Sequence, residues 1–181
     1  MTDRLILVGM MGAGKTTVGR LLAARLEWDH LDSDAQVIER TGRTVPELFA
    51  EVGEAGFRAE EARALVEALT GDRPIVVSAA GGVVLSESNR DLIRRAGTVV
   101  WLRADPGLLA RRVGRGEGRP LLGEDPAAAL VELDRVRRPL YEALAEVTVD
   151  VDDVSADRVV AEVLGHRVVT GAGIGAPGDG R

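Results

Sequence analysis

The chain has 181 residues, 45% hydrophobic and 29% charged, which is typical of one globular domain with a proper core. A net charge of −6 and an aromatic content of only 3% argue against nucleic acid or an anionic membrane as a partner. The chain lacks cysteine, which excludes disulfides, zinc–thiolate sites and cysteine catalysis. It shows no leader peptide and no apolar run of about 20 residues, so we expect a cytoplasmic protein.

Hydrophobic patterning predicts strands and helices that alternate along the chain. Compact apolar runs indicate five strands, at residues 5–8, 30–33, 74–78, 98–102 and 147–149. Helical spacing and capping patterns predict helices at 16–26, 53–70 and 86–96, one ending at Arg40, and others beginning at Thr44, Asp105, Asp125 and Ser155. The alternation predicts a three-layer α/β/α sandwich around a mainly parallel five-stranded sheet.

A phosphate-binding pattern lies between the first strand and the first helix. Residues Gly9–Thr16 read G-x-x-x-x-G-K-T, the spacing of a P-loop. Lys15 is the only one of the 23 basic residues that is not arginine. A compact ammonium on a flexible stem reaches between phosphates where a planar guanidinium does not fit. The backbone N–H groups and the helix dipole favour bound phosphate, and the Thr16 hydroxyl would reach Mg²⁺. The segment therefore predicts binding of a nucleoside triphosphate.

Two carboxylates follow the second strand. Asp32 and Asp34 are two residues apart on a segment expected to be extended, so both side chains would point to the same face. One could hold Mg²⁺ through water while the other accepts a proton from an acceptor hydroxyl. The alternative is a plain strand end in which Asp34 only caps the next helix.

Arginines and glycines supply the remaining candidates for a binding site. Arg58 and the pair Arg137–Arg138 could recognise a carboxylate through bidentate hydrogen bonds, although each alone could be a surface charge. Gly81 and Gly82 end a strand, where they would allow a ligand to approach the backbone or simply form a tight turn. Residues 111–123 have no hydrophobic face and are rich in arginine, namely Arg111, Arg112, Arg115 and Arg119. We interpret this segment as a lid that closes over the triphosphate, the alternative being a solvated basic loop.

Together these patterns resemble the shikimate kinase family over most of the chain. The family's motifs are present as G-x-M-G-x-G-K-T from Gly9, D-S-D from Asp32, G-E-x-x-F-R-x-x-E from Gly53, R-P-L-L from Arg119 and R-x-P-L-Y from Arg137. The resemblance implies ATP-dependent phosphorylation of the 3-hydroxyl of shikimate by a P-loop kinase fold with an arginine-rich lid, in a monomer. It implies one domain over residues 1–168, with the lid at about 112–124. Residues 169–181 would form a disordered glycine-rich tail.

The resemblance also assigns roles to individual residues. Asp34, Lys15 and Arg119 would be catalytic, with Asp34 as the base. ATP would contact Gly12, Ala13, Gly14, Lys15, Thr16, Thr17, Arg112 and Arg119, with Arg112 packed on adenine. Shikimate would contact Asp34, Arg58, Gly81, Gly82 and Arg137, beside an apolar wall of Phe49 and Phe57. Mg²⁺, the one cofactor expected, would be held by Thr16 and Asp32.

Two positions depart from the family pattern, and three other functions compete with it. Ala80 replaces the first glycine of a glycine triplet, which matters only if residue 80 needs a positive φ. Residues 152–155 lack the basic residue or asparagine near a proline that usually contacts adenine.

A nucleoside or gluconate kinase would need a different acceptor segment, and a GTPase would need an N-K-x-D motif, which the chain lacks. The third alternative is a domain that binds ATP without turning it over.

Overall fold

The computed structural model describes residues 3–114, 116 and 118–166. Within these residues, five parallel strands form one sheet in the order β2-β3-β1-β4-β5. The strands are β1 (Arg4–Val8), β2 (Asp29–Asp32), β3 (Ile75–Ser78), β4 (Thr98–Arg103) and β5 (Val147–Asp150). The predicted α/β class with a parallel five-stranded sheet is therefore confirmed.

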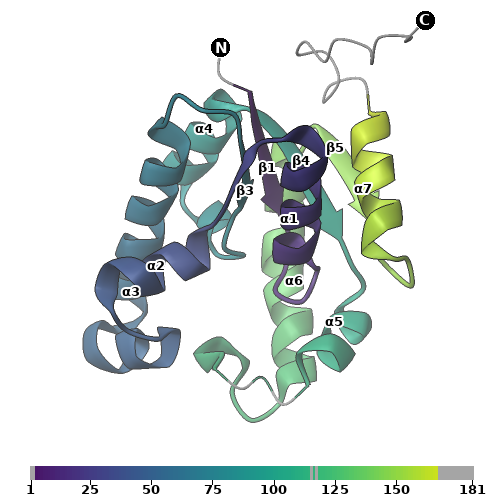
Figure 1. Cartoon of the computed structure of the whole chain (residues 1–181). Helices are drawn as coiled ribbons and strands as arrows, with labels where there is room; N and C mark the ends of the chain where they lie inside the picture. The colour runs from purple at the N-terminus through teal and green to yellow at the C-terminus, as the bar shows by residue number, and fades with distance from the viewer. Residues whose placement is uncertain (1–2, 115, 117, 167–181) are drawn as a thin grey trace, which may run out of the picture.

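Helices cover both faces of the sheet (Figure 1). They are α1 (Lys15–Leu26), α2 (Ser33–Thr41), α3 (Val45–Thr70), α4 (Glu87–Ala96), α5 (Pro106–Val113), α6 (Pro126–Leu144) and α7 (Ala156–Gly165). Two short 3₁₀ turns, η1 (Val83–Leu85) and η2 (Pro120–Leu122), complete the described elements. Helices α1 and α7 pack together on one face, and α4 and α6 lie on the other (Figure 1). No helix in the described ranges is long and apolar enough to cross a membrane.

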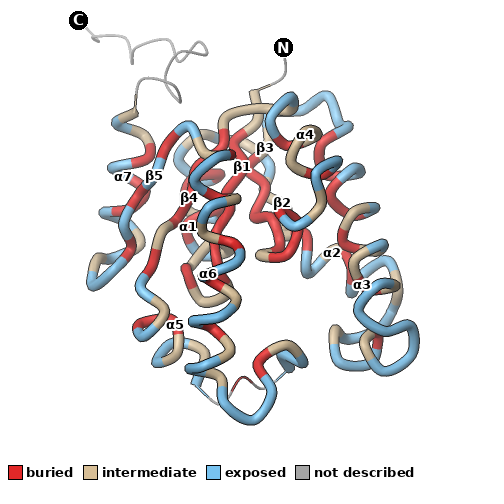
Figure 2. The backbone as a smooth tube through the Cα atoms, turned by 180° about the vertical axis from the view of Figure 1, so that it is seen from behind, coloured by how far each residue is buried: buried red, intermediate tan, exposed pale blue. Residues whose placement is uncertain are grey.

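The central strand shows why the sheet must lie between two layers of helices. Leu5, Ile6, Leu7 and Val8 are successive residues of β1, and each is at most 1% exposed. Since neighbouring side chains of a strand point to opposite faces, a run buried at every position needs cover on both sides. Figure 2 shows this buried centre, with exposed residues along the outer sides of the helices and in the loops. All five carboxyl ends meet at one edge of the sheet, the usual place for a ligand in this fold.

Helix starts follow the capping patterns in the sequence. The Thr44 N–H donates to Glu47 at 2.7 Å in a capping box. Asp105 accepts from the Gly107 and Leu108 N–H groups at 2.8 and 3.2 Å, and Asp125 and Ser155 cap α6 and α7 in the same manner. These side chains satisfy N–H groups that have no partner inside their helix.

The break expected at Gly53 is confirmed, because α3 consists of two helical segments that meet in a kink at this glycine, where φ is 67°. Two other local predictions are wrong. Arg111 and Arg112 belong to α5 rather than to an open lid. The lid segment also has an apolar anchor, because Leu122 is only 1% exposed. Arg115 and the expected tail at 169–181 lie outside the described residues.

Candidate active site

The P-loop forms the bend between β1 and α1. Gly14 is the N-cap residue of α1 and has φ 91°, a left-handed conformation that glycine adopts without a steric penalty. The Lys15 ammonium donates to the carbonyl oxygens of Gly9 and Met10 at 2.8 and 3.0 Å. Removal from water lowers the pKa of Lys15 to about 8, although the charges of Asp34 and Asp32 act in the opposite direction.

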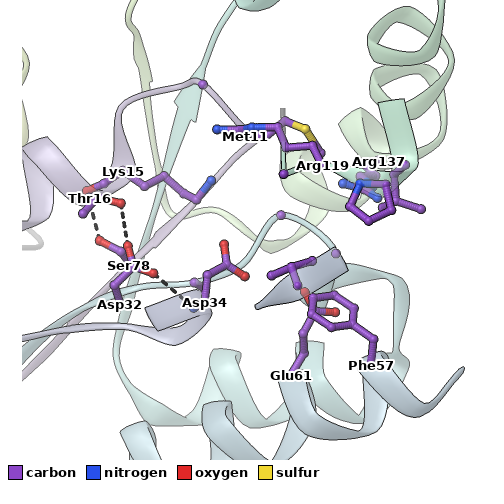
Figure 3. Close-up of a pocket in the computed structure, with 18 of the residues that line it drawn as sticks. Met11, Lys15, Thr16, Asp32, Asp34, Phe57, Glu61, Ser78, Arg119 and Arg137 are labelled. Carbon is purple, nitrogen blue, oxygen red and sulfur yellow. Dashed lines mark hydrogen bonds between the residues drawn. The ribbon is translucent and has the colours of Figure 1, made fainter. Parts of the chain in front are cut away.

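Asp32 joins the P-loop helix to the second strand. Its Oδ2 accepts a hydrogen bond from the Thr16 hydroxyl (Figure 3). Its Oδ1 accepts from the Asp34 and Ala35 N–H groups at 3.1 and 3.3 Å, so Asp32 is the N-cap of α2. Strand pairing of Asp32 with Ser78 brings this corner next to the loop that follows β3. The hydroxyl of Thr16 and the carboxylate of Asp32 are hard oxygen ligands, and this set fits a Mg²⁺ ion that shares its coordination with phosphates and water.

Asp34 lines the central cavity, but the extended conformation predicted from its spacing with Asp32 is wrong. Helix α2 begins at Ser33, so Asp34 is in its first turn and does not share an extended segment with Asp32. The capping alternative is also wrong, because the cap is Asp32. Figure 3 shows the Asp34 carboxylate facing the Lys15 side of the pocket. Although Asp34 is exposed toward the cavity, the surrounding protein excludes much of the bulk water, and this desolvation raises its pKa.

The same cavity, of about 580 Å³, extends from the P-loop to α3 and α6. Phe49 and Phe57 of α3 form one wall, with ring centroids 4.7 Å apart. Arg58 follows on α3, and Arg137 comes from α6 on the far side (Figure 3). Arg137 is only 2% exposed, and within the described residues its Nε has no hydrogen-bond partner. A buried guanidinium that lines a cavity is suited to bind an anionic ligand.

The second arginine of the pair Arg137–Arg138 turns away from the cavity. Arg138 donates to Asp134 at 2.7 Å and to the Ala104 carbonyl at 3.3 Å. The two neighbouring arginines therefore face different surroundings, and only Arg137 lines the cavity.

Glu61 is the functional candidate that sequence reasoning missed. In the sequence it is only the last position of the G-E-x-x-F-R-x-x-E motif, with no role assigned, yet it is 3% exposed and lines the cavity, where it forms an ion pair with Arg58. Burial raises the pKa of Glu61 to about 7, while the positive charges of Arg58 and Arg137 hold it lower than burial alone would. The signal was its place three residues after Arg58, since side chains at this spacing meet on a helix.

The loop after β3 lies close to Arg58 and Arg137, on the side of the cavity expected to bind the phosphate acceptor (the acceptor side). Ala80 is buried and its φ is not positive, so its methyl group needs no rearrangement. A Cβ atom on Gly82 would collide with the Arg58 guanidinium in its present position, so a side chain there would displace Arg58. The departure at position 80 is therefore tolerated by the fold, whereas Gly82 leaves the space that Arg58 occupies.

An apolar slot of about 190 Å³ lies beside the P-loop, on the side expected to bind the nucleotide (the nucleotide side). Arg112 closes this slot by donating to the Val151 and Gly12 carbonyl oxygens at 3.0 and 3.4 Å. Asp152 accepts from the Asp105 N–H at 3.0 Å and does not line the slot. Arg119, the residue before η2 in the segment expected to form the lid, lines the main cavity.

A phosphate-binding loop, a carboxylate at an acceptor site and two arginines in one cavity define a P-loop kinase for a small anionic acceptor. The family model described as Shikimate kinase matches residues 11–166. The chain belongs to the shikimate kinase family.

Curated relatives and solved structures agree with this assignment. A shikimate kinase of Thioalkalivibrio sulfidiphilus is 45% identical over 90% of this chain and 85% of its own length. One of Symbiobacterium thermophilum is 46% identical over 88% of this chain and 93% of its own length. The structure of shikimate kinase from Acinetobacter baumannii in complex with shikimate has a TM-score of 0.87 and 37% identity, covering 91% of this chain and 92% of that chain. A gluconokinase from Sinorhizobium meliloti, at 22% identity and a TM-score of 0.63, shares the fold.

Proposed function

We propose that the chain transfers the γ-phosphate of ATP to the 3-hydroxyl of shikimate, giving shikimate 3-phosphate and ADP in the route to chorismate and the aromatic amino acids. The observation that carries this proposal is that Arg58 and Arg137 lie in the same cavity as Asp34 and the P-loop. A substrate with a carboxylate at one end and a hydroxyl at the other fits that arrangement. The family membership of the chain supports the same reaction.

On the nucleotide side, the residues bind and neutralise the phosphates. The N–H groups of Gly12, Ala13 and Gly14 surround phosphate oxygens, with Lys15 between them. Thr16 and Asp32 would hold Mg²⁺, which neutralises phosphate charge when it is bound, and Thr17 follows at the same helix end. Arg119 contributes a second positive charge from the lid, and Arg112 covers the slot proposed for adenine.

On the acceptor side, Asp34 is the proposed base. The acceptor oxygen attacks the γ-phosphorus, the bond to the β–γ bridging oxygen breaks, and the proton of the hydroxyl passes to Asp34. Loss of hydration raises the pKa of this carboxyl, which makes it a better proton acceptor than an ordinary aspartate. Its proximity to Lys15 and Arg119 keeps enough of it ionised to act.

Arg58 and Arg137 fix the other end of the acceptor. Two guanidinium groups from different helices can bind one carboxylate from two directions, which sets the orientation of the ring and of its hydroxyls. Gly81 and Gly82 allow the ring to lie against the backbone. Glu61 keeps the Arg58 guanidinium in place through its ion pair.

A coupled assay of ADP release tests the proposed function. Purified, folded protein with Mg-ATP should turn over shikimate, and gluconate and nucleoside monophosphates should give at most background. Turnover of another acceptor with none of shikimate would contradict the assignment. The single lysine offers an independent check, since an amine-acylating reagent can modify only Lys15 and the N-terminus. Mg-ATP should protect Lys15 from this reagent, and equal labelling with and without nucleotide would count against the proposed site.

We also propose a monomer that acts in the cytoplasm, with residues 1–168 as a single domain. The family resemblance supports the oligomeric state. Light scattering during size-exclusion chromatography should give a mass close to 19.2 kDa.

A further inference from the structure

Two buried hydroxyl groups hold the backbone of the loop that follows β3. The Ala80 N–H donates to the Ser33 hydroxyl at 2.8 Å, and Ser33 is fully buried between the two aspartates of the acidic motif. One residue further on, the Gly81 carbonyl accepts from the Tyr141 hydroxyl at 2.7 Å. The loop is therefore tied on one side to the start of α2 and on the other to α6.

Tyr141 is itself fixed by its surroundings. It is fully buried, and its ring stacks on Trp101 of β4 with ring centroids 5.9 Å apart. Its hydroxyl also lies 3.9 Å from the sulfur of Met10 in the P-loop. A rigid aromatic ring with one hydroxyl places that hydroxyl accurately, because only two side-chain torsions need to be fixed.

The position of this loop matters because both acceptor arginines depend on it. The Arg58 guanidinium occupies the space where Gly82 would carry a Cβ atom. A Cβ atom on Gly81 would lie 3.4 Å from Arg137 Nη1 and 3.5 Å from Tyr141 Oη. If the loop shifted by a few tenths of an ångström, its backbone would therefore come too close to Arg58 or move away from Arg137.

We propose that Ser33 and Tyr141 are positioning residues for the acceptor site, which hold residues 80–82 at the distance from Arg58 and Arg137 that shikimate binding requires. This inference rests on the proposed function and adds two residues to it that need not touch substrate. Each hydroxyl acts through the backbone of the loop. Both hydrogen bonds end on the loop after β3 rather than on the P-loop. The Tyr141 hydroxyl also contacts Met10 of the P-loop, so Ser33 gives the cleaner test of an effect confined to the acceptor.

Steady-state kinetics of Ser33→Ala and Tyr141→Phe test this proposal. Each change leaves one backbone group of the loop without its partner, and a buried unpaired group carries a substantial penalty. We expect the KM for shikimate to rise about five- to twentyfold, with kcat within about threefold and the KM for Mg-ATP within about twofold of wild type. Calorimetric titration with shikimate should show the same loss of affinity without nucleotide.

Further variants separate positioning from simple stability. Ser33→Thr keeps the hydroxyl and should recover most of the shikimate KM. The double variant should show less than the product of the two single effects, because both hydroxyls hold the same loop. Thr70→Ala removes a hydroxyl that donates to the Glu67 carbonyl at 3.1 Å at the end of α3, lines neither cavity, and should leave both KM values unchanged.

The outcomes are distinguishable from failure of the proposed function. If wild type does not turn over shikimate, the function is wrong, and the same comparison applies to the acceptor that the coupled assay identifies. If the variants lose only thermal stability, or lose both substrates equally, the positioning role is overturned. Should Tyr141→Phe fail to fold, the pair Ser33→Ala and Ser33→Thr decides the question.

Discussion

The nucleotide side and the acceptor side of this pocket are held together in different ways. Apart from Arg119, the proposed phosphate-binding groups belong to one continuous segment, Gly9–Thr16, whose geometry depends on local backbone conformation at the end of β1 and the start of α1. The acceptor groups come from α2, α3, the loop after β3, and α6, and only tertiary packing brings them together. We therefore expect single substitutions to abolish phosphate binding only when they lie within Gly9–Thr16. Acceptor binding should instead be sensitive to substitutions at many positions that are distant in sequence.

Asp34→Asn should give the largest effect, because Asp34 lies where the two sides meet. The amide cannot accept the proton of the acceptor hydroxyl, so kcat should fall by about 10²- to 10⁴-fold. The affinity for Mg-ATP should stay within about twofold, as measured by equilibrium binding. Because desolvation raises the pKa of Asp34 and the base must be ionised, wild-type kcat should fall on acidification at a higher pH than an ordinary aspartate would give. Retention of wild-type kcat in the variant would exclude Asp34 as the base.

Arg137→Met should affect only the acceptor side. The buried guanidinium would no longer bind the substrate carboxylate, and loss of a charge-assisted bidentate contact raises the KM for shikimate by about 10- to 100-fold. Arg138→Met is the matched control on the same helix, because Arg138 points to Asp134 and Ala104 rather than into the cavity. Steady-state kinetics with each substrate varied in turn should show an effect for Arg137 alone. Equal effects of the two variants would contradict the geometry of α6.

The contrast between the two sides also explains what the sequence could predict. The P-loop and the strand before it were predictable, because a glycine pattern, an apolar run and a helix cap are all local signals. The boundary at Asp32–Asp34 was predicted with the wrong conformation. A two-residue spacing does not reveal that the strand ends at Asp32 and that this side chain caps the next helix.

The acceptor side was less readable, because burial there depends on neighbours distant in sequence. Glu61 follows a pattern of charged residues that is typical of a solvated helix face, and only the approach of α6 and of the loop after β3 places it in a cavity. Ser33 and Tyr141 are neutral hydroxyls inside recognisable motifs, but their partners, Ala80 and Gly81, are 47 and 60 residues away in sequence. No local pattern contains such a pairing.

Glu61→Gln should alter how the stability of the protein depends on pH. In the folded protein burial raises the pKa of Glu61 to about 7, compared with about 4.3 for a glutamate in an unfolded chain. Between these values the folded state binds a proton that the unfolded state does not. The free energy of unfolding therefore falls as pH rises through this range, and the stabilisation present below about pH 4 is lost above about pH 7.

Glutamine cannot titrate, so this part of the pH dependence should disappear in the variant. From pH 5 to pH 8, urea unfolding should show wild type losing about 1–3 kcal/mol more stability than Glu61→Gln. The comparison uses slopes with pH, so a constant offset from the lost ion pair with Arg58 does not affect it. Glu60→Gln controls for loss of a charge at the neighbouring position of α3. Parallel curves for wild type and Glu61→Gln would show that burial does not dominate at Glu61.

Gly19→Ala should give the smallest effect, and it tests whether the nucleotide side can be disturbed from behind the P-loop. Gly19 lies on α1, where an added Cβ atom would be 2.5 Å from Ser78 Oγ and 2.7 Å from His30 Nε2. The Ser78 hydroxyl donates to the Lys15 carbonyl at 3.0 Å, so its oxygen accepts from the His30 ring at 3.0 Å. A methyl group would push this pair away from the first turn of α1.

Overpacking of this kind costs about 1–3 kcal/mol of stability, so we expect a lower melting temperature. We also expect a two- to fivefold higher KM for Mg-ATP, which corresponds to about 0.4–1 kcal/mol of binding free energy. The KM for shikimate should change less, because the atoms nearest to the added Cβ atom belong to Ser78 and His30 and not to a residue proposed to bind shikimate. Gly165→Ala, where a Cβ atom would meet nothing within 4 Å, is the matched control and should leave both KM values unchanged. A larger rise in the KM for shikimate than in the KM for Mg-ATP would contradict this comparison. A change behind the P-loop would then act mainly on shikimate binding, and the two sides of the pocket would not be structurally independent.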